Sequence, residues 1–182
     1  MTEFNIRRDV MVDIETLGTT PESTIMQIAA ASFEIRTGEI LETFHQVADI
    51  SQNEAPTSGH RSSEDVLRKF RQWLKTLERN SGKLFLWGNG ILFDIAMIKR
   101  QLESLGLDYP VHYRHDRDVR TILELASHKL KKLEKEIKNE VYDGSLVAHD
   151  AFNDVINQVK LVSYCYRILV GEEASSENPN IN

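Results

Sequence analysis

The alternation of apolar and polar residues predicts three strands in the first quarter of the chain. Residues 9–16 and 25–35 are rich in β-branched residues and alanine, and residues 40–47 continue after the turn-forming run Arg-Thr-Gly-Glu at 36–39. Such a run between two apolar segments is typical of a hairpin. We therefore predict that the second and third strands pair antiparallel and that the polar residues 49–61 form a loop.

Helical spacing of apolar residues predicts a first helix that is capped by Ser62 or Ser63 and runs to about Glu78. The nearly all-apolar run 83–88 then predicts a short strand that is buried on both faces. A second helix is expected from Ile91 to Leu105, where Gly106 would end it. Strand and helix thus alternate in the middle of the chain, as in a sheet covered by helices.

The second half of the chain reads as helical. Residues 118–125 lead into a helix, residues 128–138 form a strongly charged segment, and residues 139–148 are expected to be a loop. The last helix is predicted from about Ala151 to Val170, where Gly171 ends it. Residues 172–182 have the composition of a disordered tail.

Composition indicates one soluble globular domain, with 182 residues and a formal net charge of −6. The acidic balance argues against a protein that coats nucleic acid, yet it is compatible with an enzyme that grips a strand end. The single cysteine, Cys165, excludes an internal disulfide and fits a reducing cytoplasm. We expect no signal peptide and no membrane span, because no apolar stretch approaches the roughly 18 residues that a span requires.

Two carboxylates alternate with apolar residues at the end of the first strand, in Asp13-Ile14-Glu15. Because strand side chains repeat every two positions, Asp13 and Glu15 point to the same face. Adjacent like charges cost free energy unless a cation relieves them. The pair is therefore a candidate metal site, although the same pattern also occurs as a solvated strand end.

A third carboxylate, Asp94, falls in the first turn of the helix that follows the Gly-Asn-Gly run at 88–90. The glycines let the backbone turn sharply and approach a ligand closely. Asp94 interrupts an apolar stripe, where a carboxylate is costly to bury unless it is paired or bound to a metal. The alternative is an aspartate that simply favours the helix dipole.

His149 and Asp154 lie on either side of the start of the last predicted helix. Five helical steps rotate by about 500°, so two side chains at this spacing on one helix diverge by about 140°. His149 is therefore predicted to precede the helix while Asp154 projects from its body, which lets both reach one point. The alternative makes His149 a neighbour of the helix cap and Asp154 a surface residue.

In this order, the three segments resemble the motifs of the DEDD superfamily of 3′→5′ exonucleases. Residues 13–16 (DIET) resemble the first motif, residues 89–94 (NGILFD) the second, and residues 149–154 (HDAFND) the third in its histidine-bearing form. That form marks the DEDDh branch, which includes ribonuclease T and oligoribonuclease. The match spans residues 9–170, and the run 117–121 (RDVRT) is similar to one in compact bacterial and phage enzymes of this branch.

The resemblance implies an α/β, ribonuclease H-like fold with a mixed central sheet, antiparallel first three strands and helices on both faces. It implies a single exonuclease domain over residues 1–171, and two divalent ions, Mg²⁺ or Mn²⁺, which prefer oxygen ligands. His149 is the implied general base, because the ordinary pKa of histidine lies near neutral pH. The implied catalytic carboxylates, all of them metal ligands, are Asp13, Glu15, Asp94 and Asp154.

Four further residues are implied to contact the substrate. Thr16 and Leu17 follow the first motif and are expected beside the terminal nucleotide, Thr16 at the 3′ hydroxyl and Leu17 against the base. Phe93 is expected either to stack on a base or to pack in the core. Arg120 is expected either to approach a substrate phosphate or to form a structural ion pair with Asp118.

The function that these residues and the resemblance imply is hydrolysis of phosphodiester bonds at single-stranded 3′ ends, with RNA slightly favoured over DNA. The alternatives are an exodeoxyribonuclease, a non-catalytic nucleic-acid-binding module of the same fold, and a phosphatase of mononucleotides. The lysines of residues 128–135 form either a solvated helix face or a guide for the strand. We expect a single-stranded 3′ end as partner, no membrane, a cytoplasmic location and, by analogy with this branch, a homodimer.

Overall fold

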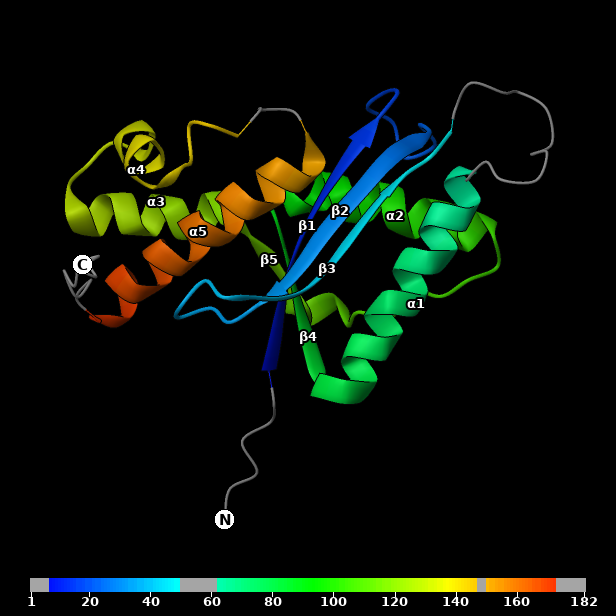
Figure 1. Ribbon diagram of the computed structural model, residues 1–182, viewed down its shortest axis with the longest axis horizontal. Helices are drawn as coiled ribbons and strands as arrows, with labels where there is room; N and C mark the ends of the chain where they lie inside the picture. Colours follow the sequence, from blue (N-terminus) through cyan, green and yellow to red (C-terminus); the bar gives the residue numbers. More distant parts are fainter. Residues whose placement is uncertain (1–6, 50–61, 147–149, 173–182) are drawn as a thin grey trace, which may run out of the picture.

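The structure is a computed structural model that describes residues 7–49, 62–146 and 150–172 (Figure 1). Its sheet has the strand order β3-β2-β1-β4-β5. The strands are β1 (Arg7–Thr16), β2 (Ile25–Phe33), β3 (Ile40–Val47), β4 (Lys83–Gly88) and β5 (Asp116–Asp118). β2 pairs antiparallel with both β1 and β3, whereas β4 is parallel to β1 and β5 is parallel to β4. The expected mixed sheet with three antiparallel first strands is confirmed.

Helices cover both faces of this sheet (Figure 1). One face carries α1 (Ser63–Ser81) and α2 (Ile91–Ser104), and the other carries α3 (Val119–Leu130), α4 (Glu134–Val141) and α5 (Ala151–Val170). A short 3-10 turn, η1 (Tyr113–His115), leads into β5. The central strand shows why both faces are covered, because Val10 and Val12 enter the core beneath α1 and α2 while Met11 enters the core beneath α5.

The turn between β2 and β3 has the predicted hairpin geometry. The Glu34 carboxylate accepts hydrogen bonds from the backbone N–H groups of Arg36 and Thr37, at 2.8 and 2.7 Å. Gly38 takes a φ of 76°, a conformation that suits glycine. Because side-chain and backbone contacts both close the turn, β3 is held in register against β2.

The structure corrects several predictions in the second half. The strand β5 was not expected, because its residues Asp-Arg-Asp carry no apolar pattern; it forms by pairing with β4 at Leu86, Trp87 and Gly88. The charged segment 128–138 is divided between α3 and α4 at Lys131, which takes a left-handed φ of 54°. The predicted loop 139–148 was wrong at its beginning, because α4 continues to Val141.

The other element ends lie close to their predicted positions. β2 ends at Phe33 rather than residue 35, and α1 extends past Glu78 to Ser81. α5 begins and ends as predicted, and Glu172, expected in the tail, forms an ion pair with Arg36. Residues 50–61 of the predicted loop and residues 173–182 of the tail lie outside the described residues. Among the helices that the structure describes, none has the length and apolarity to cross a bilayer.

Candidate active site

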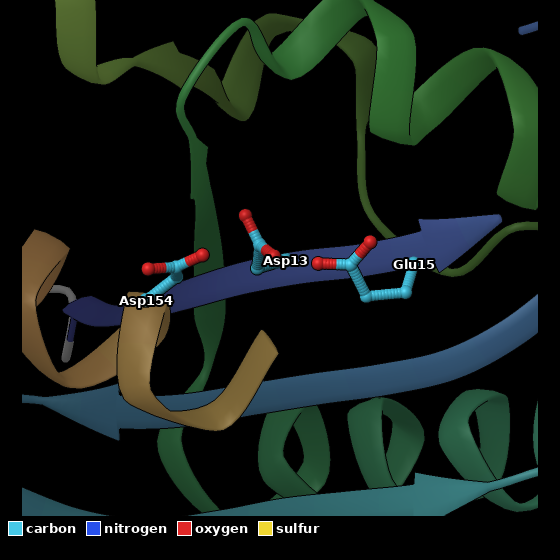
Figure 2. Close-up of side chains that lie close together, drawn as sticks. All are labelled: Asp13, Glu15 and Asp154. Atoms are coloured by element: carbon cyan, nitrogen blue, oxygen red, sulfur yellow. The ribbon is translucent and has the colours of Figure 1, made fainter. Parts of the chain in front are cut away.

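The central strand and the last helix bring three carboxylates together (Figure 2). Asp13 and Glu15 project from the same face of β1, as predicted, and Asp154 projects from the first turn of α5. One side-chain oxygen of each residue lies within 4.8 Å of the other two. All three side chains are partly exposed, so the cluster is open to solvent and to a ligand.

The start of α5 is fixed by contacts of the residues that immediately precede Asp154. Asp150 is the N-cap and accepts a hydrogen bond from the Asn153 N–H at 3.0 Å. Phe152 stacks on His45 of β3, with ring centroids 5.3 Å apart and an interplanar angle of 13°. These contacts hold the first turn of α5 against the sheet and so set the position of Asp154.

The fourth predicted carboxylate, Asp94, lies beside this cluster but is buried, at 6% exposed. Gly88 at the end of β4 leaves room for the Asp94 side chain, because a Cβ added at Gly88 would lie 2.9 Å from an Asp94 carboxylate oxygen. The glycine is therefore required for close approach and not for a special backbone conformation. Burial, reinforced by the charge of Asp13, raises the pKa of Asp94 to about 8.

The four predicted carboxylates line one cavity of about 410 Å³. Its walls also carry the side chain of Phe93, which is 42% exposed, and that of Arg120 from α3. The Arg120 guanidinium donates to the Asn89 side-chain oxygen at 3.4 Å and lies across Gly90, where an added Cβ would approach it to 3.1 Å. The pocket thus combines four carboxylates with the Arg120 guanidinium and the accessible ring of Phe93.

The Asp118 carboxylate contacts backbone N–H groups, which differs from the ion pair with Arg120 that was one of the two alternatives. One Asp118 oxygen caps α3 by accepting from the backbone N–H groups of Arg120 and Thr121. Its other oxygen accepts from the N–H groups of Gly90 and Ile91 at 3.0 and 2.9 Å. Asp118 therefore joins the starts of α2 and α3, and the Arg120 guanidinium contacts Asn89 instead.

Of the other predicted site residues, Thr16 and Leu17 lie in the turn after β1, and His149 lies outside the described residues. The Thr16 hydroxyl donates a hydrogen bond to the Gly18 carbonyl at 2.6 Å, within the turn that follows β1. Leu17 is 61% exposed in that turn. His149 lies outside the described residues, immediately before the cap Asp150.

Sequence reasoning missed Gln158, one turn after Asp154 on α5. Its amide nitrogen donates to a carboxylate oxygen of Asp13 at 3.1 Å, although Gln158 is only 4% exposed. Its carbonyl oxygen is buried without a hydrogen-bond partner in the described structure. The spacing of four residues from Asp154 was the available signal, because residues four apart share a helix face.

The residues of the pocket fit divalent cations. Hard cations such as Mg²⁺ and Mn²⁺ prefer carboxylate oxygens, and the three clustered acids supply only such atoms. The raised pKa of Asp94 also indicates a cation site, since burial and the charge of Asp13 disfavour a further negative charge there when no cation is bound. The geometry and the electrostatics are both those expected of a metal site.

Comparison with solved structures places the fold among nucleases. The nuclease domain of 3′hExo, a DEDDh family member bound to rAMP, matches 94% of this chain and 96% of its own, with a TM-score of 0.62 and 18% identity. Cell-death related nuclease 4 (CRN-4) has a TM-score of 0.67 and 18% identity over 92% of this chain and 65% of its own. E. coli Exonuclease I with a dA16 oligonucleotide has a TM-score of 0.58 and 16% identity over 91% of this chain and 42% of its own.

The fold is that of the ribonuclease H-like DEDDh nucleases, and its pocket gathers acidic side chains that could bind metal. More particularly, residues 8–166 match the model of one family, and the chain belongs to it: the Rv2179c-like 3′-5′ exoribonuclease domain. The sequence matches no curated protein in pairwise comparison. The chain is therefore a 3′→5′ exonuclease, a hydrolase of a class that depends on divalent metal.

Proposed function

We propose that this protein removes nucleotides from single-stranded 3′ ends, with RNA preferred to DNA, in a reaction that uses two divalent ions and His149. The observation that carries the proposal is the convergence of Asp13, Glu15 and Asp154 within 4.8 Å, with Asp94 in the same cavity. The family, whose members are described as exoribonucleases, supports RNA as the substrate.

In this proposal, Asp13, Glu15, Asp94 and Asp154 hold two ions, Mg²⁺ or Mn²⁺. When bound, such ions activate a water molecule and neutralise charge at the attacking and leaving oxygens of a phosphodiester. The acids do more than hold charge, because their separate elements fix where a phosphate can approach. Gln158 orients Asp13 through its amide hydrogen bond.

His149 would accept the proton of the attacking water as general base. A neutral imidazole suits this step, because its ordinary pKa of about 6.5 leaves it unprotonated yet basic near neutral pH. Its place in the sequence supports the role, since it comes one residue before the cap of the helix that carries Asp154.

The other polar and apolar groups of the pocket would position the last nucleotide. Arg120 supplies the cationic group of the cavity and is suited to a phosphate oxygen. The accessible ring of Phe93 is suited to stack on the terminal base, and the exposed side chain of Leu17 is suited to pack against the same base. Thr16 would donate to, or accept from, the terminal hydroxyl.

The test is digestion of 5′-labelled RNA and DNA of matched sequence, single-stranded and in duplex, with Mg²⁺ or Mn²⁺. We expect a ladder of products shortened from the 3′ end, faster for single-stranded RNA, and no ladder in EDTA. Asp13→Asn should abolish the ladder, whereas Glu103→Gln, which removes an exposed carboxylate from the far end of α2, should not.

Each result decides a separate part of the proposal. Faster digestion of DNA would overturn the RNA preference but not the reaction, and full activity of Asp13→Asn would overturn the acidic pocket as the active site. Release of phosphate from a mononucleotide with no shortening of oligomers would identify a phosphatase instead.

A further inference from the structure

A second surface lies beside the start of β5, nearer the beginning of β1 than the acidic pocket is. It combines arginines with exposed or half-exposed rings, and we call it the arginine–aromatic patch. Its residues are Phe85, His112, Tyr113, Arg114, His115 and Arg117.

The rings of the patch form a continuous series. Phe85 contacts His115 at 4.6 Å between centroids, His115 contacts His112 at 5.3 Å, and His112 contacts Tyr113 at 4.6 Å. Tyr113 ends the series and is 65% exposed. These contacts are tilted, at 30–49° between ring planes, and a large ring that is so exposed at the end of the series can pack against another planar group.

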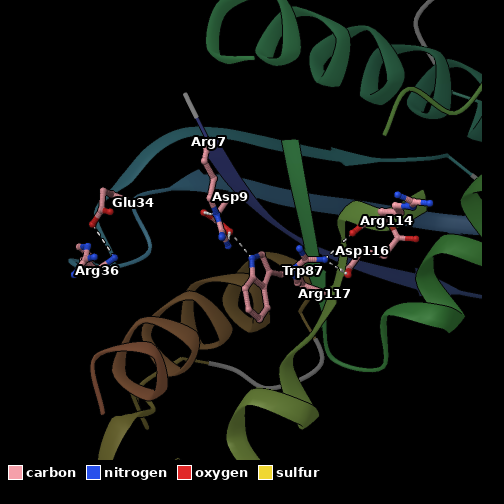
Figure 3. Close-up of polar contacts among 8 residues, drawn as sticks. All are labelled: Arg7, Asp9, Glu34, Arg36, Trp87, Arg114, Asp116 and Arg117. Atoms are coloured by element: carbon pink, nitrogen blue, oxygen red, sulfur yellow. Dashed lines mark hydrogen bonds and ion pairs between the residues drawn. The ribbon is translucent and has the colours of Figure 1, made fainter. Parts of the chain in front are cut away.

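Two arginines of the patch keep their charge available. Arg117 lies over the Phe85 ring at 4.8 Å, and its hydrogen bonds go to the backbone carbonyls of Arg114 and Asp116, not to a carboxylate (Figure 3). Arg114 lies over Tyr113 at 5.5 Å and is exposed. Arg7, also above Phe85, is by contrast neutralised by Asp9 at 2.7 Å.

An apolar groove of about 580 Å³ lies between this patch and the acidic pocket in the residues that line it. Arg117 lines the groove and also contacts Phe85, so it belongs to both the groove and the patch. Leu92 of α2 lines the groove too, is 81% exposed and directly precedes Phe93 of the acidic pocket. Leu125 of α3, which is 53% exposed, and the buried Trp87 add apolar surface to the groove.

The sheet gives the distance over which these surfaces extend. Phe85 is in register with Asp9 of β1, four residues before Asp13. At about 3.3 Å per strand residue, the patch begins roughly 13 Å from the first of the acids. A ligand that occupies both must therefore be longer than one or two nucleotides.

We propose that the groove and the arginine–aromatic patch bind the part of a single-stranded nucleic acid that lies 5′ of the nucleotide being removed. The inference rests on the proposed function, which sets the 3′ end in the acidic pocket. Bases would lie against the leucines of the groove and stack on Tyr113, and phosphates would contact Arg114 and Arg117. Stacking rings along a cationic path bind single strands with little dependence on sequence. Charge complementarity with phosphates favours this ligand, since the hydrogen bonds of Arg114 and Arg117 go to a tyrosine hydroxyl and to backbone carbonyls.

The test compares binding of 5′-fluorescein single strands of 12 and 2 nucleotides, measured by anisotropy in EDTA, where cleavage is absent. Tyr113→Ala should weaken binding of the 12-nucleotide strand by about tenfold, the loss expected for one stacked base. Arg114→Glu should weaken it by at least about fivefold and reduce its log–log salt dependence by about 0.7. Neither should change binding of the 2-nucleotide strand by more than about twofold.

Arg68→Glu is the matched control, because it reverses an exposed charge on α1, on the opposite face of the sheet. It should leave both strands unaffected. In Mn²⁺, Tyr113→Ala and Arg114→Glu should raise KM for the long strand and leave its kcat unchanged.

The outcomes separate this inference from the proposed function. Wild-type affinity of both patch variants for the 12-nucleotide strand would overturn the inference while leaving the reaction intact. A change of oligomeric state in the variants, seen by sedimentation, would identify the patch as an interface between copies and also overturn it. Failure of the wild type to shorten any oligomer would instead refute the proposed function, with the binding difference in EDTA still measured.

Discussion

Removal of the Asp118 carboxylate should destabilise the protein more than removal of an ordinary helix cap. Its two oxygens accept from four backbone N–H groups, two at the start of α3 and two at the start of α2. Gly90, the N-cap residue of α2, offers no side-chain cap of its own. Asp118→Ala therefore leaves the first turns of both helices without these acceptors.

The size of the destabilisation follows from the loss of the α3 cap and the loss of the hydrogen bonds at the start of α2. An N-cap is worth about 1 kcal/mol, and the two hydrogen bonds to Gly90 and Ile91 add about 2 kcal/mol, reduced from the charged-acceptor value because Asp118 is partly exposed. We expect a total of about 3 kcal/mol, or a fall in Tm of roughly 6–12 °C for a chain of this size. Asp118→Asn should cost about half as much, since its NH₂ group replaces one of the two acceptors.

Urea unfolding in EDTA measures this loss without any contribution from bound metal. Ser62→Ala is the matched control, because Ser62 caps α1 through a single side-chain contact with the Asp65 N–H. An equal cost for Asp118→Ala and Ser62→Ala would refute the idea that one carboxylate caps two helices. The variant should also need more metal for half-maximal activity, because the α2 start that it loosens carries Asp94.

Three other predictions concern the pocket itself. Because the folded pKa of Asp94 is raised to about 8, its contribution to stability is full below about pH 4 and is lost as pH rises through 8. Urea unfolding of Asp94→Asn in EDTA should thus show higher stability than the wild type at pH 8, by at most about 5 kcal/mol, and a wild type without this pH dependence would contradict the burial argument. Gln158→Met should raise the Mn²⁺ concentration for half-maximal activity about 10- to 100-fold with little change in Tm, and an unchanged Mn²⁺ titration would exclude a positioning role. His149→Ala should lower kcat by about 10²- to 10⁴-fold and remove the rise in rate through about pH 6.5, so full turnover across neutral pH would make the general-base role untenable.

The sequence predicted those parts of the fold that have a strong apolar period. β3, β4 and α5 have the predicted ends, because alternation or helical spacing continues up to a turn residue such as Gly171. β5 could not be found this way, since three polar residues become a strand only through pairing with β4. α4 was missed because its single buried residue, Ile137, leaves almost no apolar stripe to detect.

The sequence could predict which carboxylates form the candidate site, but not the contacts that hold the surrounding elements in place. The spacing of Asp13 and Glu15 fixes their common face, and the sequence of motifs indicates that Asp94 and Asp154 join them. The double contact of Asp118 depends on how close the α2 and α3 starts lie, which no local pattern encodes. The same is true of the contact between Phe85 and His115, because these two residues come from segments 30 positions apart, whereas the other rings of the series are neighbours within residues 112–115.

The position of α5 in chain order has a consequence during protein synthesis. Asp154 lies 141 positions after Asp13, on the final described helix, so a nascent chain that has only emerged through β4 cannot complete the acidic cluster. Nuclease chemistry is thereby delayed until nearly all of the domain has left the ribosome. A truncated product that stops before residue 151 would keep Asp13, Glu15 and Asp94 but lack Asp154, so its cluster would stay incomplete.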